Sequence, residues 1–130
     1  MLMMTGLAFF LSASSLPGEP APASQPEAKL ALGYTVKNRQ IDAESAGHCY
    51  QPGESVIAWT HITGLATGFV EHVWFRNGEE VARHYLPVSS GRSWRTWSRH
   101  TLQAGDYRVQ ILAPDRKELA VSTFSAKVCE

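Results

Sequence analysis

The chain has 130 residues, and its 12 basic and 12 acidic side chains give a formal net charge of zero at pH 7. Apolar residues make up 44% of the sequence, which is close to the average of globular proteins and excludes a disordered tail, a collagen-like chain and a coiled coil. A general nucleic-acid binder would carry a basic excess, so we expect no nucleic-acid partner. The length fits a single domain with a small hydrophobic core.

Residues 1–16 have the pattern of a secretory signal peptide. An apolar run over residues 2–11 passes into small residues, and it is too short for a membrane-spanning helix, which needs about 20 apolar residues. Cleavage is expected after Ser14 or after Ala23. No basic residue precedes Lys29, which a start codon assigned too far downstream would explain; the alternative is a disordered apolar terminus. We therefore expect an exported protein, periplasmic or secreted, with no transmembrane span.

Residues 17–28 hold four of the seven prolines and predict a stiff, solvated linker, because proline cannot donate to a strand ladder. Residues 29–130 then form one domain, which contains both cysteines, Cys49 and Cys129. An even pair of cysteines in an exported chain predicts a disulfide bond. The alternative is two free thiols or half of a metal site.

Residues 29–130 show period-two alternation and turn signals but no amphipathic helix. Pro52-Gly53 suits a type II turn, and Asn77-Gly78 predicts a type I′ hairpin turn, in which both central residues have positive φ. Residues 37–53 are predicted as a polar loop. The strand number and spacing predict an all-β fold, an antiparallel immunoglobulin-like β-sandwich of about seven strands, with a small barrel as the alternative. The predicted strands are 29–36, 54–63, 69–76, 79–88, 92–100, 107–113 and 119–125.

Specific motifs follow one another along most of residues 30–126. A strand with His72 and Trp74 precedes Asn77-Gly78, and Arg-Thr-Trp-Ser follows at residues 95–98. This order resembles the bacterial family catalogued as domain of unknown function 2914. The chain departs from the family pattern at Tyr107, where a tryptophan is expected, and at Gln40, where a proline is expected. The resemblance implies a β-rich domain of envelope or membrane-associated bacterial proteins and implies no activity, since the family has none assigned.

The predicted strand 92–100 has the most unusual composition. Alternation places two tryptophans and three arginines on its two faces, where guanidinium groups can stack on indole rings. Exposed tryptophan faces bind sugar rings, and arginine grips carboxylate or phosphate groups. The alternative is a buried tryptophan core with arginine stems packed along it. The binding candidates are Arg92, Trp94, Arg95, Trp97 and Arg99, together with His72 and Trp74 on their own strand.

Segment 76–100 is also locally basic. It contains Arg76, Arg83 and the three arginines of strand 92–100, but its acidic residues are only Glu79 and Glu80. Such a surface fits an anionic glycan, a lipid headgroup or an acidic protein. The alternative is an ordinary solvated sheet face.

The histidines and Ser98 raise two further hypotheses. If the strand with Trp59 and His61 pairs with the strand of His72 and Trp74, an aromatic and imidazole cluster forms. Zinc or copper ligands are then available, although no recognised metal spacing is present and we predict no cofactor. Ser98, a histidine and Asp106 suggest a hydrolase triad, but no G-x-S-x-G motif is present. The candidate metal ligands are His61, His72, His84 and His100.

The leading hypothesis is a non-catalytic binding or interaction module of the cell envelope, whose partner is an envelope protein or glycan. The alternatives are a periplasmic metal-binding protein and an envelope hydrolase. His72 and Trp74 are expected in or near the core, so that replacing either with alanine lowers stability.

Overall fold

A computed structural model describes residues 26–65, 68–89 and 93–130. The predicted signal peptide, most of the predicted linker and Arg92 lie outside these residues. The described part contains eight strands and no helix, so it also contains no helix long and apolar enough to cross a membrane. The strands are β1 (Glu27–Lys37), β2 (Gln40–Ala43), β3 (Ser55–Thr63), β4 (Gly68–Arg76), β5 (Glu79–Val88), β6 (Ser93–Thr101), β7 (Gly105–Leu112) and β8 (Glu118–Ala126).

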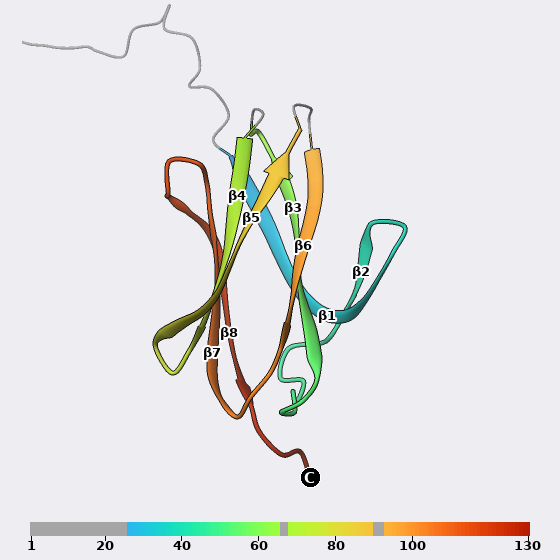
Figure 1. The fold of residues 1–130 in the computed structure, drawn as a ribbon. Coiled ribbons are helices and arrows are strands. Elements are labelled where there is room, and N and C mark those ends of the chain that lie inside the picture. The colour runs from blue at the N-terminus through green and yellow to red at the C-terminus, as the bar shows by residue number, and fades with distance from the viewer. Residues whose placement is uncertain (1–25, 66–67, 90–92) are drawn as a thin grey trace, which may run out of the picture.

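The strands form two four-stranded antiparallel sheets that face each other (Figure 1). Sheet A has the order β2-β1-β3-β6, and sheet B has the order β5-β4-β7-β8. The predicted antiparallel β-sandwich is confirmed, and the sheets do not close into the alternative barrel. Because β3 pairs with β6 rather than with β4, the chain crosses between the sheets twice between these two strands.

The turn predictions agree with the structure. Asn77 and Gly78 have φ values of 52° and 85°, as a type I′ turn requires. Gly53 has a φ of 91°, and the amide of Glu54 donates to the carbonyl of Gln51 at 3.2 Å, which closes the Pro52-Gly53 turn. These turns fix where the neighbouring strands begin and end.

The prediction of a polar loop over residues 37–53 is wrong at its start, where β2 forms. Asn38 and Arg39, with φ values of 52° and 62°, make a two-residue hairpin between β1 and β2. Most of β2 is exposed, so it lacks the apolar alternation that marks a half-buried strand. Gly33 permits this hairpin to bend, because a Cβ there would lie 2.4 Å from the carbonyl oxygen of Asp42.

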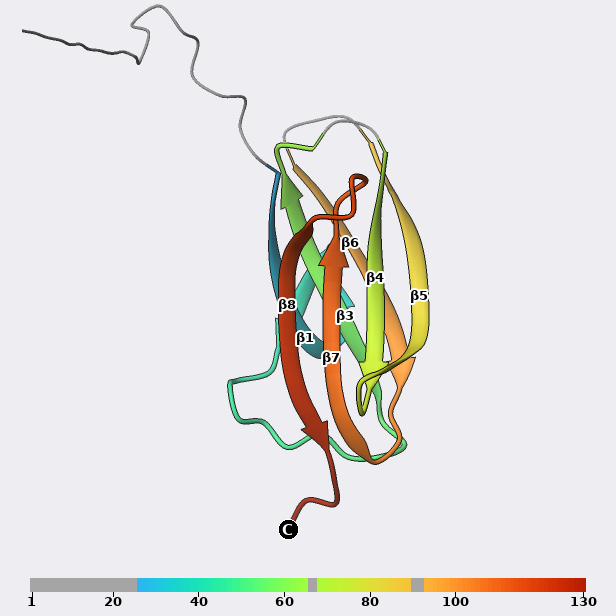
Figure 2. The same ribbon diagram turned by 90° about the vertical axis from the view of Figure 1, so that its left-hand side faces the viewer.

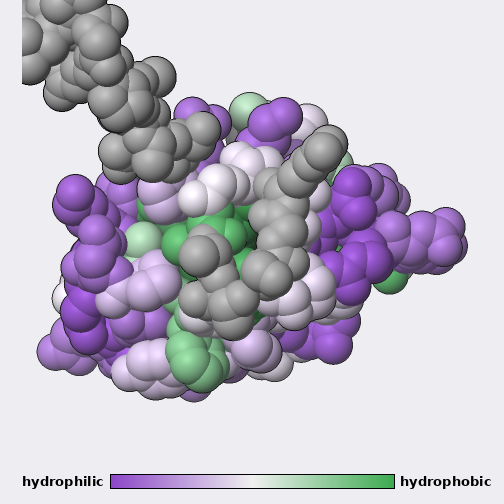
Figure 3. All heavy atoms as spheres, turned by 90° about the horizontal axis from the view of Figure 1, so that it is seen from above, coloured by the Kyte–Doolittle hydropathy of each residue, from purple (hydrophilic) through white to green (hydrophobic). Residues whose placement is uncertain are grey.

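Apolar side chains from both sheets fill the interior between them. Trp74 is fully buried in this interior. Figure 3 shows apolar surface among hydrophilic residues at the end of the sandwich where β3 ends and β4 begins. The predicted disulfide joins Cys49 to Cys129 and ties the segment after β8 to the segment before β3. The main buried apolar residues around Trp74 are Val56, Ala58, Ile62, Val70, Val109 and Ile111.

Candidate functional site

The face of sheet A that points away from sheet B carries a set of tryptophan and basic side chains. The register of β1, β3 and β6 aligns residues of these strands in rows across the sheet, and side chains of alternate residues share a face. Two adjacent rows concern us. The aromatic row is Ala31, Trp59 and Trp97, and the cationic row is Lys29, His61 and Arg95.

The cationic row has no acidic partner in the described part of the chain: neither Lys29 nor Arg95 forms an ion pair there. Burial lowers the pKa of His61, and the positive charges of Arg95 and Lys29 lower it further. Nε2 of His61 and Nε of Arg95 are buried and make no hydrogen bond within the described residues. Buried polar groups are nearly always paired, so these two nitrogens, like Nε2 of His84 in sheet B, are exceptions among the described residues.

The aromatic row is held by the tip of the β1–β2 hairpin. Nε1 of Trp59 donates to the carbonyl oxygen of Arg39 at 2.9 Å, and Nη2 of Arg39 donates to the carbonyl oxygen of Arg95 at 3.0 Å. Trp59 is only 7% exposed, whereas its cross-strand neighbour Trp97 is partly exposed. Trp97 therefore offers the accessible aromatic surface, next to Arg95.

A second polar cluster lies inside the sandwich and joins the two sheets. Nε1 of Trp74 donates to Oγ of Ser98 at 3.1 Å, and Oγ of Ser98 lies 2.8 Å from Nδ1 of His72. On the other side of the ring, Nε2 of His72 lies 3.2 Å from Oγ1 of Thr60, which donates to the carbonyl oxygen of Thr96 at 3.0 Å. We call this hydrogen-bonded series, which runs from Trp74 through Ser98, His72 and Thr60 to the carbonyl group of Thr96, the interior chain.

The interior chain has one consistent direction of donation. The only hydroxyl hydrogen of Thr60 goes to the carbonyl of Thr96, so Nε2 of His72 must donate to Thr60. Nδ1 of His72 then accepts from the hydroxyl of Ser98, which itself accepts from Trp74. The ring is thus neutral with its proton on Nε2. Burial lowers the pKa of His72 to about 3, and the nearby His84 adds to the effect.

The structure places the other histidines around this chain without completing a metal site. His100 stacks on Trp74 with ring centroids 5.2 Å apart, and His84 lies opposite His72 in the β4–β5 pair. In residues 26–65, 68–89 and 93–130, no group of three or more His, Cys, Asp or Glu side chains is arranged to hold a metal ion. His61 belongs to the cationic row, on the opposite side of sheet A.

Several expected groupings are not found. Trp59 and His61 lie in sheet A, whereas His72 and Trp74 lie in sheet B, so their strands do not pair and the cluster that such pairing would create does not form. Ser98 does contact a histidine, but Asp106 accepts a hydrogen bond from Ser125 at 2.7 Å and does not complete a triad.

The members of the predicted Arg/Trp strand lie on different faces. Trp94 packs against the core, and the guanidinium group stacked near its ring, 5.1 Å from the centroid, comes from Arg39 rather than from β6. Arg95, Trp97 and the exposed Arg99 lie on the outer face of sheet A. Reasoning from the sequence did not find Lys29, Trp59 or Arg39 as neighbours of these residues, because only the pairing of β1, β3 and β6 brings them together.

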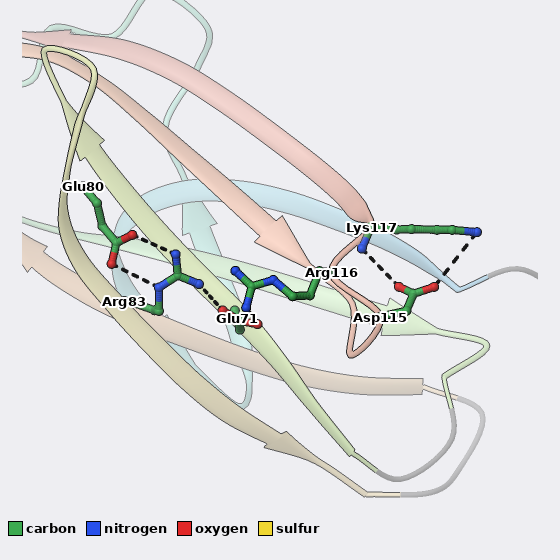
Figure 4. Close-up of polar contacts among 6 residues, drawn as sticks. All are labelled: Glu71, Glu80, Arg83, Asp115, Arg116 and Lys117. Carbon is green, nitrogen blue, oxygen red and sulfur yellow. Dashed lines mark hydrogen bonds and ion pairs between the residues drawn. The ribbon is translucent and has the colours of Figure 1, made fainter.

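The predicted basic surface of segment 76–100 is divided between the two sheets. Arg83 lies on the outer face of sheet B, where its guanidinium group bonds to both Glu80 and Glu71, and Arg116 approaches Glu71 at 3.8 Å (Figure 4). These bonds raise the pKa of Arg83. This arginine therefore has its acidic partners within the fold, unlike Arg95.

Comparison with known proteins concerns mainly sheet B. No curated protein matches the chain. A family model with the description "Protein of unknown function (DUF2914)" matches residues 69–126, a stretch that runs from β4 through β8, and the resemblance of this chain to that family is thereby confirmed.

Proposed function

We propose that this protein is an exported, non-catalytic binding module of the cell envelope, and that its ligand-binding surface is the outer face of sheet A. One observation carries the proposal: the cationic row lies beside the aromatic row, and no acidic side chain of the described residues pairs with it. Lys29 and Arg95 supply donors and positive charge for carboxylate or phosphate groups, the neutral His61 lies between them, and Trp97 supplies a flat apolar face for a sugar ring. An envelope glycan that carries acidic groups combines both features.

Other features support export and a binding role. The apolar run at residues 2–11 is typical of a signal peptide, and disulfides such as that of Cys49 with Cys129 persist in oxidising compartments. The contacts of His72 with the hydroxyl groups of Ser98 and Thr60 are buried inside the sandwich. A histidine with a pKa of about 3 is a weak general base near neutral pH, because an efficient base has a pKa close to the working pH.

The test is titration of the full chain with two glycans while tryptophan fluorescence is recorded. Peptidoglycan muropeptides carry carboxylates, and chitohexaose is a neutral counterpart. We expect a saturable change with the muropeptides that weakens as salt is added, and a loss of at least tenfold in affinity in Arg95→Ala and in Trp97→Ala. Lys117→Ala, an exposed substitution next to sheet B, is the matched control and keeps the wild-type affinity.

Two results would contradict the proposal. Equal binding of both glycans, or an unchanged affinity in Arg95→Ala, means that the cationic row does not bind the ligand. Export is tested separately by fractionating cells that express the full chain and sequencing the N-terminus of the product. We expect a processed protein outside the cytoplasm, cut after Ser14 or after Ala23; an uncut cytoplasmic protein contradicts export.

A further inference from the structure

β8 is the last strand of sheet B, and within residues 26–65, 68–89 and 93–130 its outer edge is paired at one end only. Tyr50 forms an isolated parallel bridge with Ala126, and the amide of Lys127 donates to the carbonyl oxygen of Tyr50 at 2.9 Å. The disulfide of Cys49 with Cys129 lies beside this bridge. The protein thus places a short piece of its own chain against the edge of β8, and no strand of the described residues pairs with the rest of that edge.

The remaining edge of β8 has backbone groups ready for pairing. Backbone N–H groups in a strand point to alternate edges, so those of Val121 and Thr123 point to the same side as that of Lys127. Pairing with β7 uses the opposite edge. Between Leu119 and Ala126 the strand has no charged residue and no proline, the features that protect exposed edges in other sheets.

A groove of about 970 Å³ runs along this edge. Ser122 to Ser125 of β8 form one side and Leu30 to Leu32 of β1 lie across from them, while residues 44–48 form the outer wall. Figure 2 shows the segment between β2 and β3 standing beside the C-terminal part of β8. Leu30, Leu32 and Phe124 also pack against the core, so the bottom of the groove is apolar.

We propose that this groove binds one extended segment of another polypeptide as an added strand on β8, which continues the pairing that Tyr50 begins. Main-chain hydrogen bonds to Val121 and Thr123 hold the segment, and its alternate side chains are apolar because they face Leu30, Leu32 and Phe124. A second copy of this chain is disfavoured, because its own β8 belongs to a four-stranded sheet and residues 44–48 stand where that sheet would continue.

The test uses a phage-displayed library of random nonapeptides selected on the full chain, with enriched peptides then synthesised. We expect enriched sequences with apolar residues at alternate positions, and amide NMR shifts on binding that concentrate in β8 and in Leu30 to Leu32. Thr123→Pro removes an edge amide without touching the β7 ladder and weakens binding at least tenfold. Thr123→Ala keeps the amide and serves as the matched control.

If Thr123→Pro does not fold, a change in the peptide instead of the protein still tests the proposal. Methylating alternate backbone nitrogens of the peptide removes its donors to β8, and one of the two possible methylation patterns must weaken binding at least tenfold. Failure to enrich any peptide, or equal binding with both methylation patterns, overturns the proposal. So does a dimer in sedimentation analysis that Thr123→Pro abolishes. Arg95→Ala leaves peptide binding unchanged, which separates this groove from the glycan surface.

Discussion

His72 and His61 have similar local sequences and opposite surroundings. Each lies on a strand two residues from a tryptophan, Trp74 in one case and Trp59 in the other. Both ring nitrogens of His72 are paired in the interior chain, whereas Nε2 of His61 is buried beside Arg95 and has no hydrogen-bond partner in the part of the chain that the structure describes. Buried polar groups that satisfy one another hold a fold together, whereas the unpaired nitrogens of His61 and Arg95 contribute no hydrogen bond to the described fold.

The largest expected effect comes from His72→Ala. The change leaves a cavity in the core and removes the partners of Ser98 and Thr60, so we expect the free energy of unfolding to fall by about 4 kcal/mol. Urea denaturation measures this loss. His61→Ala is the matched control, with a loss below about 1 kcal/mol, because no hydrogen bond of the described fold is broken. Equal losses in the two variants would remove the contrast between the two histidines.

Ser98→Ala tests the hydrogen bonds that join His72 and Trp74 in the interior chain. It leaves Nδ1 of His72 and Nε1 of Trp74 buried without partners, at a cost of about 2–3 kcal/mol. Ser125→Ala, which removes an exposed hydroxyl bonded to Asp106, is the control and costs less than about 1 kcal/mol. A loss from Ser98→Ala no larger than that of the control would contradict the interior chain.

The interior chain also makes stability depend on pH. His72 has a pKa of about 3 in the folded protein and about 6.5 when unfolded, so between these values the unfolded chain binds more protons. Its contribution is therefore complete above pH 6.5 and is lost as the pH falls toward 3, at up to about 1.4 kcal/mol per pH unit. His100, whose pKa is also lowered by burial, adds a loss of the same sign.

Two measurements check the pH dependence. Denaturation midpoints should fall as the pH is lowered from 6.5, and NMR of the His72 ring should show a neutral Nε2-protonated form that does not titrate between pH 8 and pH 5. A His72 ring that protonates near pH 6.5 in the folded protein would contradict its burial in a satisfied chain.

The sequence predicted the strands well because alternation and turn chemistry are local. Asn77-Gly78 and Pro52-Gly53 specify their turns without help from the rest of the fold. β2 escaped prediction because its exposed residues carry no apolar alternation, and the only local signal was Asn38, a residue that tolerates positive φ.

The candidate site was less predictable because it depends on which strands are neighbours. Arg95 and Trp97 were identified from composition, but Lys29 and Trp59 join them only through the pairing of β3 with both β1 and β6. The contact of His72 with Ser98 crosses from one sheet to the other, and no local pattern encodes the packing of two sheets. The sequence therefore identified the residue types and left their groupings to topology.

The smallest expected change in stability comes from Arg95→Leu, and it gives the sharpest separation of binding from folding. The substitution removes a buried nitrogen that lacks an acceptor, so the free energy of unfolding should change by less than about 0.5 kcal/mol while muropeptide affinity is lost. Arg83→Leu is the matched comparison on sheet B. Arg83→Leu removes the closest ion-pair partner of the nearly buried Glu71. The free energy of unfolding should therefore fall by about 2 kcal/mol, while the affinity for muropeptides stays unchanged. If Arg95→Leu destabilises the protein as much as Arg83→Leu does, the cationic row is part of the structural framework, and the ligand surface must be sought elsewhere.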